Sequence, residues 1–162
     1  MDIPTEPGLY VDHHGGLHFR PADQPAQGRR GIHAVLRHED AILLVRPPDA
    51  EWLELPGGGV ERHESVSQAL RRELLEEAGV DLPLERLRSR REVRLQSRYF
   101  SSNHNAYWRY DQTFRLVMLP VRPTLHQPGE RGHQRLWVPL DAIAGQPLHH
   151  VHRLGLERLL AQ

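Results

Sequence analysis

Apolar and polar residues along the chain follow two different periods. The densest apolar run, rich in Val, Ile and Leu, covers residues 41–45 and predicts a buried central strand. Residues 9–11 and 17–19 flank Gly15 and Gly16, and this pattern predicts a short hairpin because a glycine pair supplies the turn. Further strand patterns, some of them weak, lie at residues 32–36, 51–55, 87–95, 107–121 and 136–140.

Two other segments follow the helical period. The first predicted helix covers residues 66–78; it begins after Ser65, which can form a capping box with Gln68, and it ends at Gly79. A closing helix is predicted over residues 149–161. The apolar faces of the two helices consist of Leu70, Leu74 and Ala78 in the first and of Val151, Leu154, Leu159 and Leu160 in the second.

Strand pairs with one helix between them and one at the end predict an α/β sandwich on a mixed sheet. The length of 162 residues suits one domain with one core. Residues 1–29 are rich in Pro, Gly and His, so we treat them as an N-terminal extension ahead of a main domain of residues 30–162. A hairpin of two short strands is marginal alone. It is therefore expected to pack on the main domain or on a second subunit, which would make the protein a homodimer.

Composition excludes several classes of protein. The chain has no Cys, which excludes disulfides, thiolate catalysis and cysteine zinc sites and agrees with a cytoplasmic location. All 21 basic residues are Arg, so any phosphate clamp must use the guanidinium group. The formal net charge is zero, so we do not expect nucleic acid as a partner. No apolar run approaches the roughly 18 residues of a membrane-spanning helix, so we expect no membrane partner.

Five of the 12 histidines fall at predicted turns or helix ends. His13 and His14 occupy the predicted hairpin turn, and His149, His150 and His152 stand near the start of the closing helix. We expect all five to face solvent rather than to bind a metal.

An acidic cluster marks the first helix. Glu73, Glu76 and Glu77 are three and four residues apart, so their carboxylates fall on one helix face and repel one another. A divalent cation would neutralise them, and carboxylate ligands favour Mg²⁺ or Mn²⁺. The preceding glycines, Gly57 to Gly59, can bring backbone groups close to a ligand. A glycine loop before an acidic helix suits a metal-bound phosphate.

These residues belong to a longer pattern that resembles the Nudix box. The pattern has seven fixed and two aliphatic positions, which coincide by chance at roughly 10⁻⁹ per starting point. All nine positions are filled, by Gly58, Glu64, Arg72, Glu73, Leu74, Glu76, Glu77, Gly79 and Val80.

The resemblance implies a Nudix-type α/β/α sandwich and a Mg²⁺-dependent or Mn²⁺-dependent hydrolase. Its general substrate would be a nucleoside diphosphate linked to another moiety, cleaved at the pyrophosphate linkage. Three glutamates resemble the family's metal ligands, and the Gly57 carbonyl is a further ligand; Arg72 resembles the residue that orients the first glutamate. The three ligands are Glu73, Glu76 and Glu77, and Glu76, Glu77 and Arg72 count as catalytic residues.

Other site residues follow less directly from the resemblance. Arg46 leaves the central strand where family members often bind substrate phosphates, and Gly58 and Gly59 would bind substrate through their backbone. The general base is open, because family members take it from different places. Glu130 in a late glycine-rich loop is our first choice, and His133 or a box glutamate are the alternatives.

The linked moiety also stays open among nucleoside triphosphates, dinucleoside polyphosphates and nucleotide sugars. The ADP-ribose branch usually carries a Pro near the position of Leu95 and Gln96, and none is present. Tyr99 lies near the position where dinucleoside polyphosphate hydrolases often place a Tyr. A catalytically silent nucleotide sensor is the alternative from another class. Isoprenoid diphosphate isomerisation is disfavoured because the cysteine it uses is absent.

Overall fold

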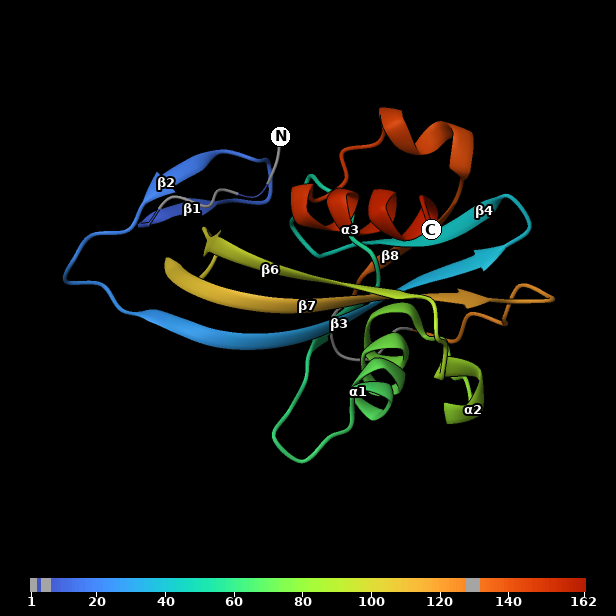
Figure 1. Cartoon of the computed structure of the whole chain (residues 1–162). Helices are drawn as coiled ribbons and strands as arrows, with labels where there is room; N and C mark the ends of the chain where they lie inside the picture. The colour runs from blue at the N-terminus through green and yellow to red at the C-terminus, as the bar shows by residue number, and fades with distance from the viewer. Residues whose placement is uncertain (1–2, 4–6, 128–131) are drawn as a thin grey trace.

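The computed structural model describes residue 3 and residues 7–127 and 132–162, and over these residues the chain forms one eight-stranded sheet (Figure 1). Seven strands follow the order β2-β1-β6-β7-β3-β4-β8, and β5 pairs with β3. The strands are β1 (Leu9–Val11), β2 (Leu17–Phe19), β3 (Ala26–His38), β4 (Ala41–Arg46), β5 (Gly57–Gly59), β6 (Glu92–Ser101), β7 (Ala106–Met118) and β8 (Gln134–Pro139).

The sheet is mixed, as predicted. β3 and β7 run parallel along a register from Ala26 opposite Tyr107 to Arg37 opposite Met118. β6 pairs with β7 and β4 pairs with β8 in antiparallel fashion. The long parallel pair β3–β7 therefore forms the centre of the sheet, and the glycine strand β5 lies at its edge.

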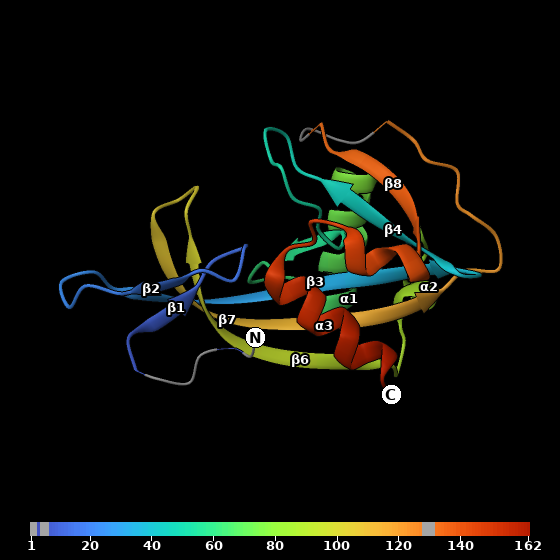
Figure 2. The same ribbon diagram turned by 90° about the horizontal axis from the view of Figure 1, so that it is seen from above.

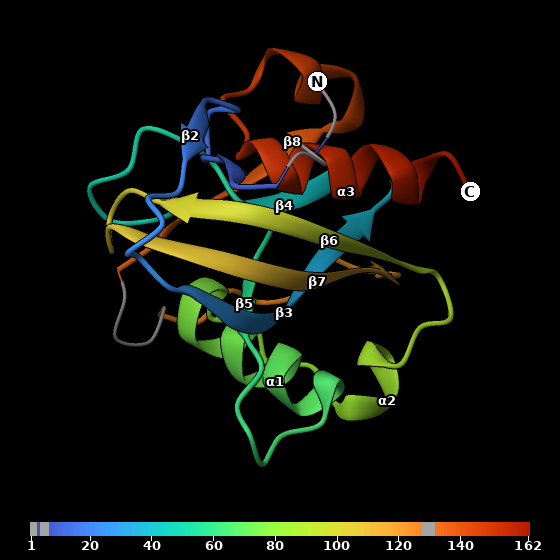
Figure 3. The same cartoon turned by 60° about the vertical axis from the view of Figure 1, so that its left-hand side comes forward.

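Helices cover both faces of the sheet (Figure 3). α1 (Val66–Glu73) continues into η1 (Leu74–Ala78) and lies on one face with α2 (Leu84–Leu87), while α3 (His150–Leu160) lies on the other after the 3₁₀ turn η2 (Leu140–Gly145). The predicted sandwich is confirmed. The first helix has the predicted ends, but η1 is a π-helix, in which the turn is wider than in an α-helix.

Each face of the sheet has its own apolar core, because successive strand residues point to opposite faces. Ile32, Ala34 and Leu36 of β3 pack with the first helix, through Leu70 and Leu74. The core under α3 contains Val35, Ile42, Leu44, Tyr99, Phe114, Leu116, Val151, Leu156 and Leu159. The first helix is thus fixed against the centre of the sheet, which places its acidic side beside β5.

The N-terminal hairpin is confirmed and joins the main sheet. β1 and β2 pair in antiparallel fashion, and β1 also pairs in parallel with β6 at Val11 and Tyr99 (Figure 2). Tyr10 and Val11 are buried. β3 begins at Ala26, so the boundary placed between residues 29 and 30 falls inside a strand. The hairpin therefore packs on the main domain of its own chain.

Two predicted strands differ from the structure. Residues 87–95 do not form one strand, because Leu84–Leu87 is the short helix α2 and β6 begins only at Glu92. Residues 51–55 form only isolated bridges at Leu53 and Glu54. None of the described helices is long and apolar enough to cross a membrane.

Candidate functional site

The first helix is anchored at its start by the predicted capping box. The Ser65 hydroxyl accepts a hydrogen bond from the Gln68 backbone N–H at 3.1 Å, and the Gln68 side chain accepts one from the Ser65 N–H at 2.8 Å. Buried Arg115 of β7 donates to the Ser67 hydroxyl and to the Leu87 carbonyl, both at 3.0 Å. These bonds fix the helix on the sheet before its acidic end is reached.

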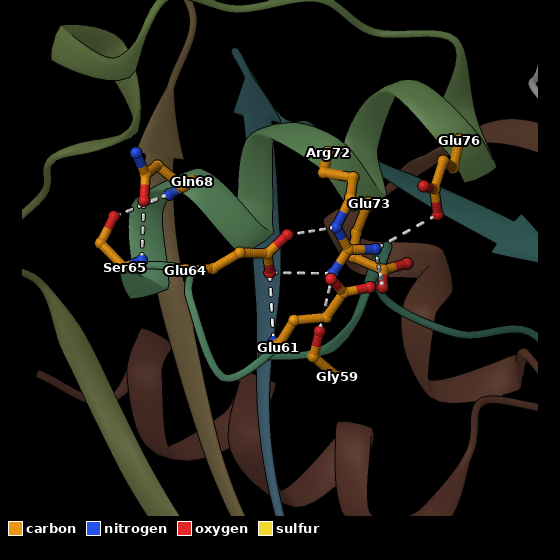
Figure 4. A network of polar contacts seen from close by, with 8 residues as sticks. All are labelled: Gly59, Glu61, Glu64, Ser65, Gln68, Arg72, Glu73 and Glu76. Carbon is orange, nitrogen blue, oxygen red and sulfur yellow. Dashed lines mark hydrogen bonds and ion pairs between the residues drawn. The ribbon is translucent and has the colours of Figure 1, made fainter.

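Arg72 is the centre of a partly buried polar network beside this helix (Figure 4). It binds Glu64 with two nitrogens, Nε at 2.5 Å and Nη2 at 3.0 Å. Its Nη1 donates to Glu73 at 2.8 Å and to Glu76 at 3.3 Å, and its Nη2 donates to the Gly59 carbonyl at 2.9 Å. The bonds with Glu64 raise the pKa of Arg72 and lower the pKa of the Glu64 carboxyl. One guanidinium therefore joins three carboxylates to the glycine strand.

The glycines of β5 allow this close approach. Gly57 has φ +151°, and its N–H donates to Glu77 Oε2 at 3.1 Å. A Cβ on Gly58 would lie 2.5 Å from the Glu73 carboxyl carbon. A side chain on Gly59 would meet only the flexible end of Arg29, at 3.4 Å. The backbone of β5 thus lies directly against the box carboxylates.

The three predicted ligands are divided between two sets of partners. Glu73 and Glu76 bind Arg72, whereas Glu77, only 4% exposed, binds Gly57 and lies 3.7 Å from Nε2 of His133. Among the described residues, no group of three or more His, Cys, Asp or Glu side chains is arranged to hold an ion. Binding of one cation by all three glutamates therefore requires their side chains to rotate.

Two features of this face nevertheless fit a hard cation. Glu73 and Glu76 already share the positive charge at one atom, Arg72 Nη1, and carboxylate oxygens are ligands that Mg²⁺ and Mn²⁺ prefer. Because Gly58 has no side chain, the Glu73 carboxyl lies directly against the backbone of β5, where backbone oxygens can add to the carboxylate ligands. The donor set therefore has the chemistry for a divalent cation, although it is not a preformed cage.

Two further predicted site residues lie at the end of β4 and just before β8. Arg46 ends β4 opposite Gln134 of β8, and its Nε is buried without a hydrogen-bond partner in the described part of the chain. His133, next to Gln134, is buried and contacts Glu77. Glu130 lies outside the described residues.

The prediction of solvent-facing histidines is wrong for His13, His149 and His152, which are all buried. His149 and His152 stack at 4.3 Å between ring centroids, and His152 lies 4.2 Å from His33 of β3. His13 stacks on Trp52 at 3.8 Å. His150 is half-buried, and His14 is exposed as predicted.

Two of these histidines hold the backbone that leads into the glycine strand. The Leu55 N–H donates to Nδ1 of His152 at 3.1 Å, and the Leu55 carbonyl accepts from Nδ1 of His33 at 3.3 Å. Gln112 then donates to the other ring nitrogen of His33 at 3.1 Å. Burial lowers the pKa of His33 to about 4, and it also lowers the pKa of His152 well below its ordinary value. Both imidazoles are therefore neutral at pH 7.

Tyr99, noted above for its place near a tyrosine of dinucleoside polyphosphate hydrolases, belongs to the same buried region. Its hydroxyl lies 3.2 Å from Nε2 of His149, while Nδ1 of His149 accepts from the Val151 N–H at 3.2 Å. Burial lowers the pKa of His149 to about 3. The tyrosine therefore packs under α3 rather than in an open site.

Sequence reasoning missed Arg29. Its guanidinium carbon lies 4.3 Å from the ring centroid of Trp108 and 5.5 Å from that of Tyr110, in cation–π contact. It lines a groove of about 440 Å³ together with Arg72 and Glu73. The available signal was a pair of arginines directly ahead of the buried run at residues 32–36.

Comparison with known proteins bears on this network of box residues. The profile of one family, described as the NUDIX domain, matches residues 27–159. The chain belongs to the NUDIX domain family. The match contains all of residues 58–80, so the resemblance drawn from the box is confirmed.

Individual members of the Nudix family match only a shorter part of this chain, or match most of it at low sequence identity. A Bacillus subtilis (strain 168) protein, provisionally named as an 8-oxo-dGTP diphosphatase, is 44% identical over 50 residues, or 31% of this chain and 34% of that protein. The chain thus matches about one third of the length of its curated relatives.

Solved Nudix structures share the fold. A MutT NUDIX hydrolase from Burkholderia pseudomallei is 29% identical with a TM-score of 0.58, covering 81% of this chain and 97% of that one. A bifunctional NMN adenylyltransferase/ADP ribose pyrophosphatase from Francisella tularensis, complexed with AMP and a Mn ion, is 22% identical with a TM-score of 0.67. That likeness covers 87% of this chain and 43% of the other, and it concerns the fold alone.

Proposed function

We propose that this Nudix domain hydrolyses the pyrophosphate linkage of a nucleoside diphosphate derivative with the help of Mg²⁺ or Mn²⁺. The observation that carries the proposal is the Arg72 network, which holds Glu64, Glu73 and Glu76 around one edge of an open groove. A pyrophosphate linkage is anionic, so hydrolysis requires neutralised phosphoryl oxygens and an activated water. An acidic face that recruits a cation beside a groove supplies both.

The metal would be held by Glu73, Glu76 and Glu77 with the Gly57 carbonyl. When bound, it would neutralise the phosphoryl oxygens and lower the pKa of a water molecule. Arg72 would keep Glu73 in place through its 2.8 Å bond. The backbone of Gly58 and Gly59 would contact substrate beside the carboxylates, and Gly59 lines the groove.

Three groups remain candidates for the general base. Glu130 is our first choice; it precedes His133 by three residues in the sequence, and His133 contacts Glu77 at 3.7 Å. His133 itself or a box glutamate would serve as alternatives. Arg46 is proposed as a phosphate clamp, because its buried Nε has no partner among the described residues and a guanidinium fork suits phosphate.

The substrate is a small nucleotide derivative. The name of the Bacillus subtilis relative, an 8-oxo-dGTP diphosphatase, supports a nucleoside triphosphate. Dinucleoside polyphosphates and nucleotide sugars remain in the proposed class. We further propose a cytoplasmic location, in keeping with the absence of Cys.

A nucleotide-binding sensor without catalysis is the second candidate. One observation favours it. Within the described residues, no group of three or more His, Cys, Asp or Glu side chains is arranged to hold a metal ion.

A substrate screen separates the two functions. Wild-type protein with Mg²⁺ or Mn²⁺ would be given dinucleoside polyphosphates and nucleotide sugars, with phosphate read after phosphatase coupling, and nucleoside triphosphates, with released pyrophosphate read through a pyrophosphatase. Hydrolysis that stops in excess chelator and falls by orders of magnitude in Glu76→Gln supports the enzyme. Nucleotide binding without turnover on any substrate would support the sensor instead.

A further inference from the structure

The groove beside Glu73 continues across the sheet, away from the box. Its first part, about 440 Å³, is lined by Arg72 and Glu73. The next part, about 610 Å³, shares the stretch of β3 at Gly28 with the first. It then meets a cavity of about 510 Å³ that is lined from β6 and β7. The three spaces together cross β3, β7 and β6, so a ligand much longer than a diphosphate can lie in them.

Arginines concentrate in the middle part. Arg30, Arg62 and Arg109 line it and are exposed, and within the described residues none of their side chains has a hydrogen bond or ion pair with the protein. Arg29 lies beside them on Trp108. These four cations outnumber the acidic side chains that line this part, which are Glu61, Glu64 and Asp111, and Glu64 is already bound by Arg72. The middle of the groove therefore has an excess of unpaired positive charge.

Gly28 is the residue that all three spaces share. A Cβ built on it would have no heavy atom within 4 Å, and its φ is not in the left-handed region. The backbone conformation therefore does not require a glycine. What the glycine does is leave the passage between the three spaces open.

The far cavity offers polar groups for the end of a ligand. Gln96, Ser97 and Asp111 line it, and Ser97 is only 4% exposed. Its hydroxyl is buried without a hydrogen-bond partner in the part of the chain that the structure describes. The polar side chains that a ligand can reach in this cavity include Gln96, which is exposed, and Asp111, which is half-buried.

From this arrangement we propose that the preferred substrate carries phosphate beyond the scissile linkage, that is, at least three phosphates in a row. Arg30, Arg62 and Arg109 hold the outer phosphates, and the terminal group lies in the cavity lined by Gln96 and Asp111. Guanidinium groups bind phosphate oxygens through two parallel N–H bonds, which suits a flexible polyphosphate chain. This proposal rests on the proposed function, because it places the scissile linkage at the box.

The first test measures binding and needs no turnover. Inorganic tripolyphosphate and inorganic diphosphate would be titrated into the full chain with Mg²⁺ by calorimetry. Wild type should bind tripolyphosphate at least about tenfold more tightly than diphosphate, the effect of one charge-assisted contact. Arg30→Gln and Arg109→Gln should reduce that preference. Arg158→Gln, the same change at an exposed arginine of α3 on the opposite face, should retain it. Equal affinities in wild type, or a preference unchanged in both groove variants, would overturn the proposal.

The second test measures turnover with the same variants. In Arg109→Gln, kcat/KM should fall about tenfold or more for diadenosine tetraphosphate but less than about threefold for ADP-ribose. Equal losses on the two substrates would contradict the proposal. If wild type hydrolyses neither these two compounds nor any nucleoside triphosphate, the proposed function fails, and the tripolyphosphate titration still decides on the groove.

Gly28 provides a variant that does not disturb the fold. Gly28→Glu places a carboxylate where the three spaces meet and should abolish the preference for tripolyphosphate. Gly28→Ala should keep it, since a methyl group there meets no atom within 4 Å. A thermal unfolding midpoint equal to that of wild type would show that both variants are folded. A Gly28→Glu protein that is folded and retains the full preference would overturn the proposal.

Discussion

The segment that enters and forms β5 is held from both faces of the sheet, but by opposite kinds of chemistry. On the α1 face, Arg72 and the box glutamates bind the strand at Gly57 and Gly59 through charged groups. On the α3 face, neutral imidazoles of His33 and His152 bind both backbone groups of Leu55. The contact of Arg72 with Gly59 borders an open groove, and the contact of Glu77 with Gly57 is buried beside it, whereas the imidazole contacts are all buried.

This difference has a physical reason. Charged groups lose solvation when they are buried, and a buried charge is tolerated only with close partners. Neutral imidazoles can satisfy a buried peptide without that cost, because each offers one donor and one acceptor. The protein therefore keeps its charges on the side where a ligand enters, and it fixes the same backbone from the rear with uncharged groups.

Removing the charge of Arg72 should have the largest effect on turnover and stability. Arg72→Met leaves Glu64, Glu73 and Glu76 without their shared cation, so we expect turnover to fall by about 10²-fold or more and the free energy of unfolding to fall by about 3 kcal/mol. Urea denaturation and hydrolysis assays measure both quantities.

The neighbouring arginine is the matched control for this change. Arg71 pairs with Asp81 at 3.1 Å, and both side chains are about half exposed. Arg71→Met should therefore cost less than about 1 kcal/mol. Equal effects of the two substitutions would show that the network has no special role.

Lowering the pH should reduce the free energy of unfolding through the buried, neutral histidines under α3. The pKa of His33 is lowered to about 4 and that of His149 to about 3 in the folded chain, whereas both titrate near 6.5 when unfolded. As the pH falls from 6.5 to 4, the unfolded chain binds more protons than the folded one. The free energy of unfolding should then drop by about 1.4 kcal/mol per pH unit for each such histidine.

Urea denaturation at pH 7, 6 and 5 measures this slope. His149→Asn should reduce the slope by one proton. The carboxyl of Glu64 contributes little to this slope, because at its ordinary pKa of 4.5 it is already largely ionised in the unfolded chain above pH 5, and Arg72 lowers that pKa further in the folded chain. An unchanged free energy of unfolding between pH 7 and pH 5 would contradict the neutral, buried state of the histidines.

Two adjacent glycines give a smaller and more local test. Gly58→Ala places a methyl group 2.5 Å from the Glu73 carboxyl carbon, so Glu73 must move, and we expect turnover to fall by about tenfold or more. Gly59→Ala meets only the end of Arg29 at 3.4 Å and should stay within about threefold of wild type. The ratio of the two kcat values is the measurement, and a ratio near one would argue against a fixed position for Glu73.

Local signals allowed much of the fold to be predicted. The capping box of Ser65 and Gln68 and the stop at Gly79 depend on residues close in sequence, and each is present in the structure. The π-helical turn at Leu74–Ala78 was not predicted. It coincides with the contact of Glu77 with Gly57, which lies 20 residues earlier and has no local signature.

The wrong predictions share this cause. Residues 87–95 alternate like a strand, yet Leu87 is the last residue of a short helix. Its carbonyl accepts a hydrogen bond from Arg115, which is 28 residues away. His152 was expected to face solvent because imidazoles are polar. Its position with Gly155, Leu156 and Leu159 on the buried face of α3 follows the helical period and could have indicated burial. The partner that satisfies it, Leu55, is 97 residues distant and could not be read from the sequence.

The acidic side of the first helix is proposed to bind a divalent cation for hydrolysis, and a titration with Mn²⁺ measures that binding. Calorimetry or electron paramagnetic resonance would compare wild type with Glu73→Gln and Glu76→Gln, using Glu85→Gln in exposed α2 as the control. We predict that each box variant loses at least about tenfold in Mn²⁺ affinity, whereas the control binds like wild type. Equal Mn²⁺ binding by all four proteins, or full turnover in excess chelator, would contradict the account.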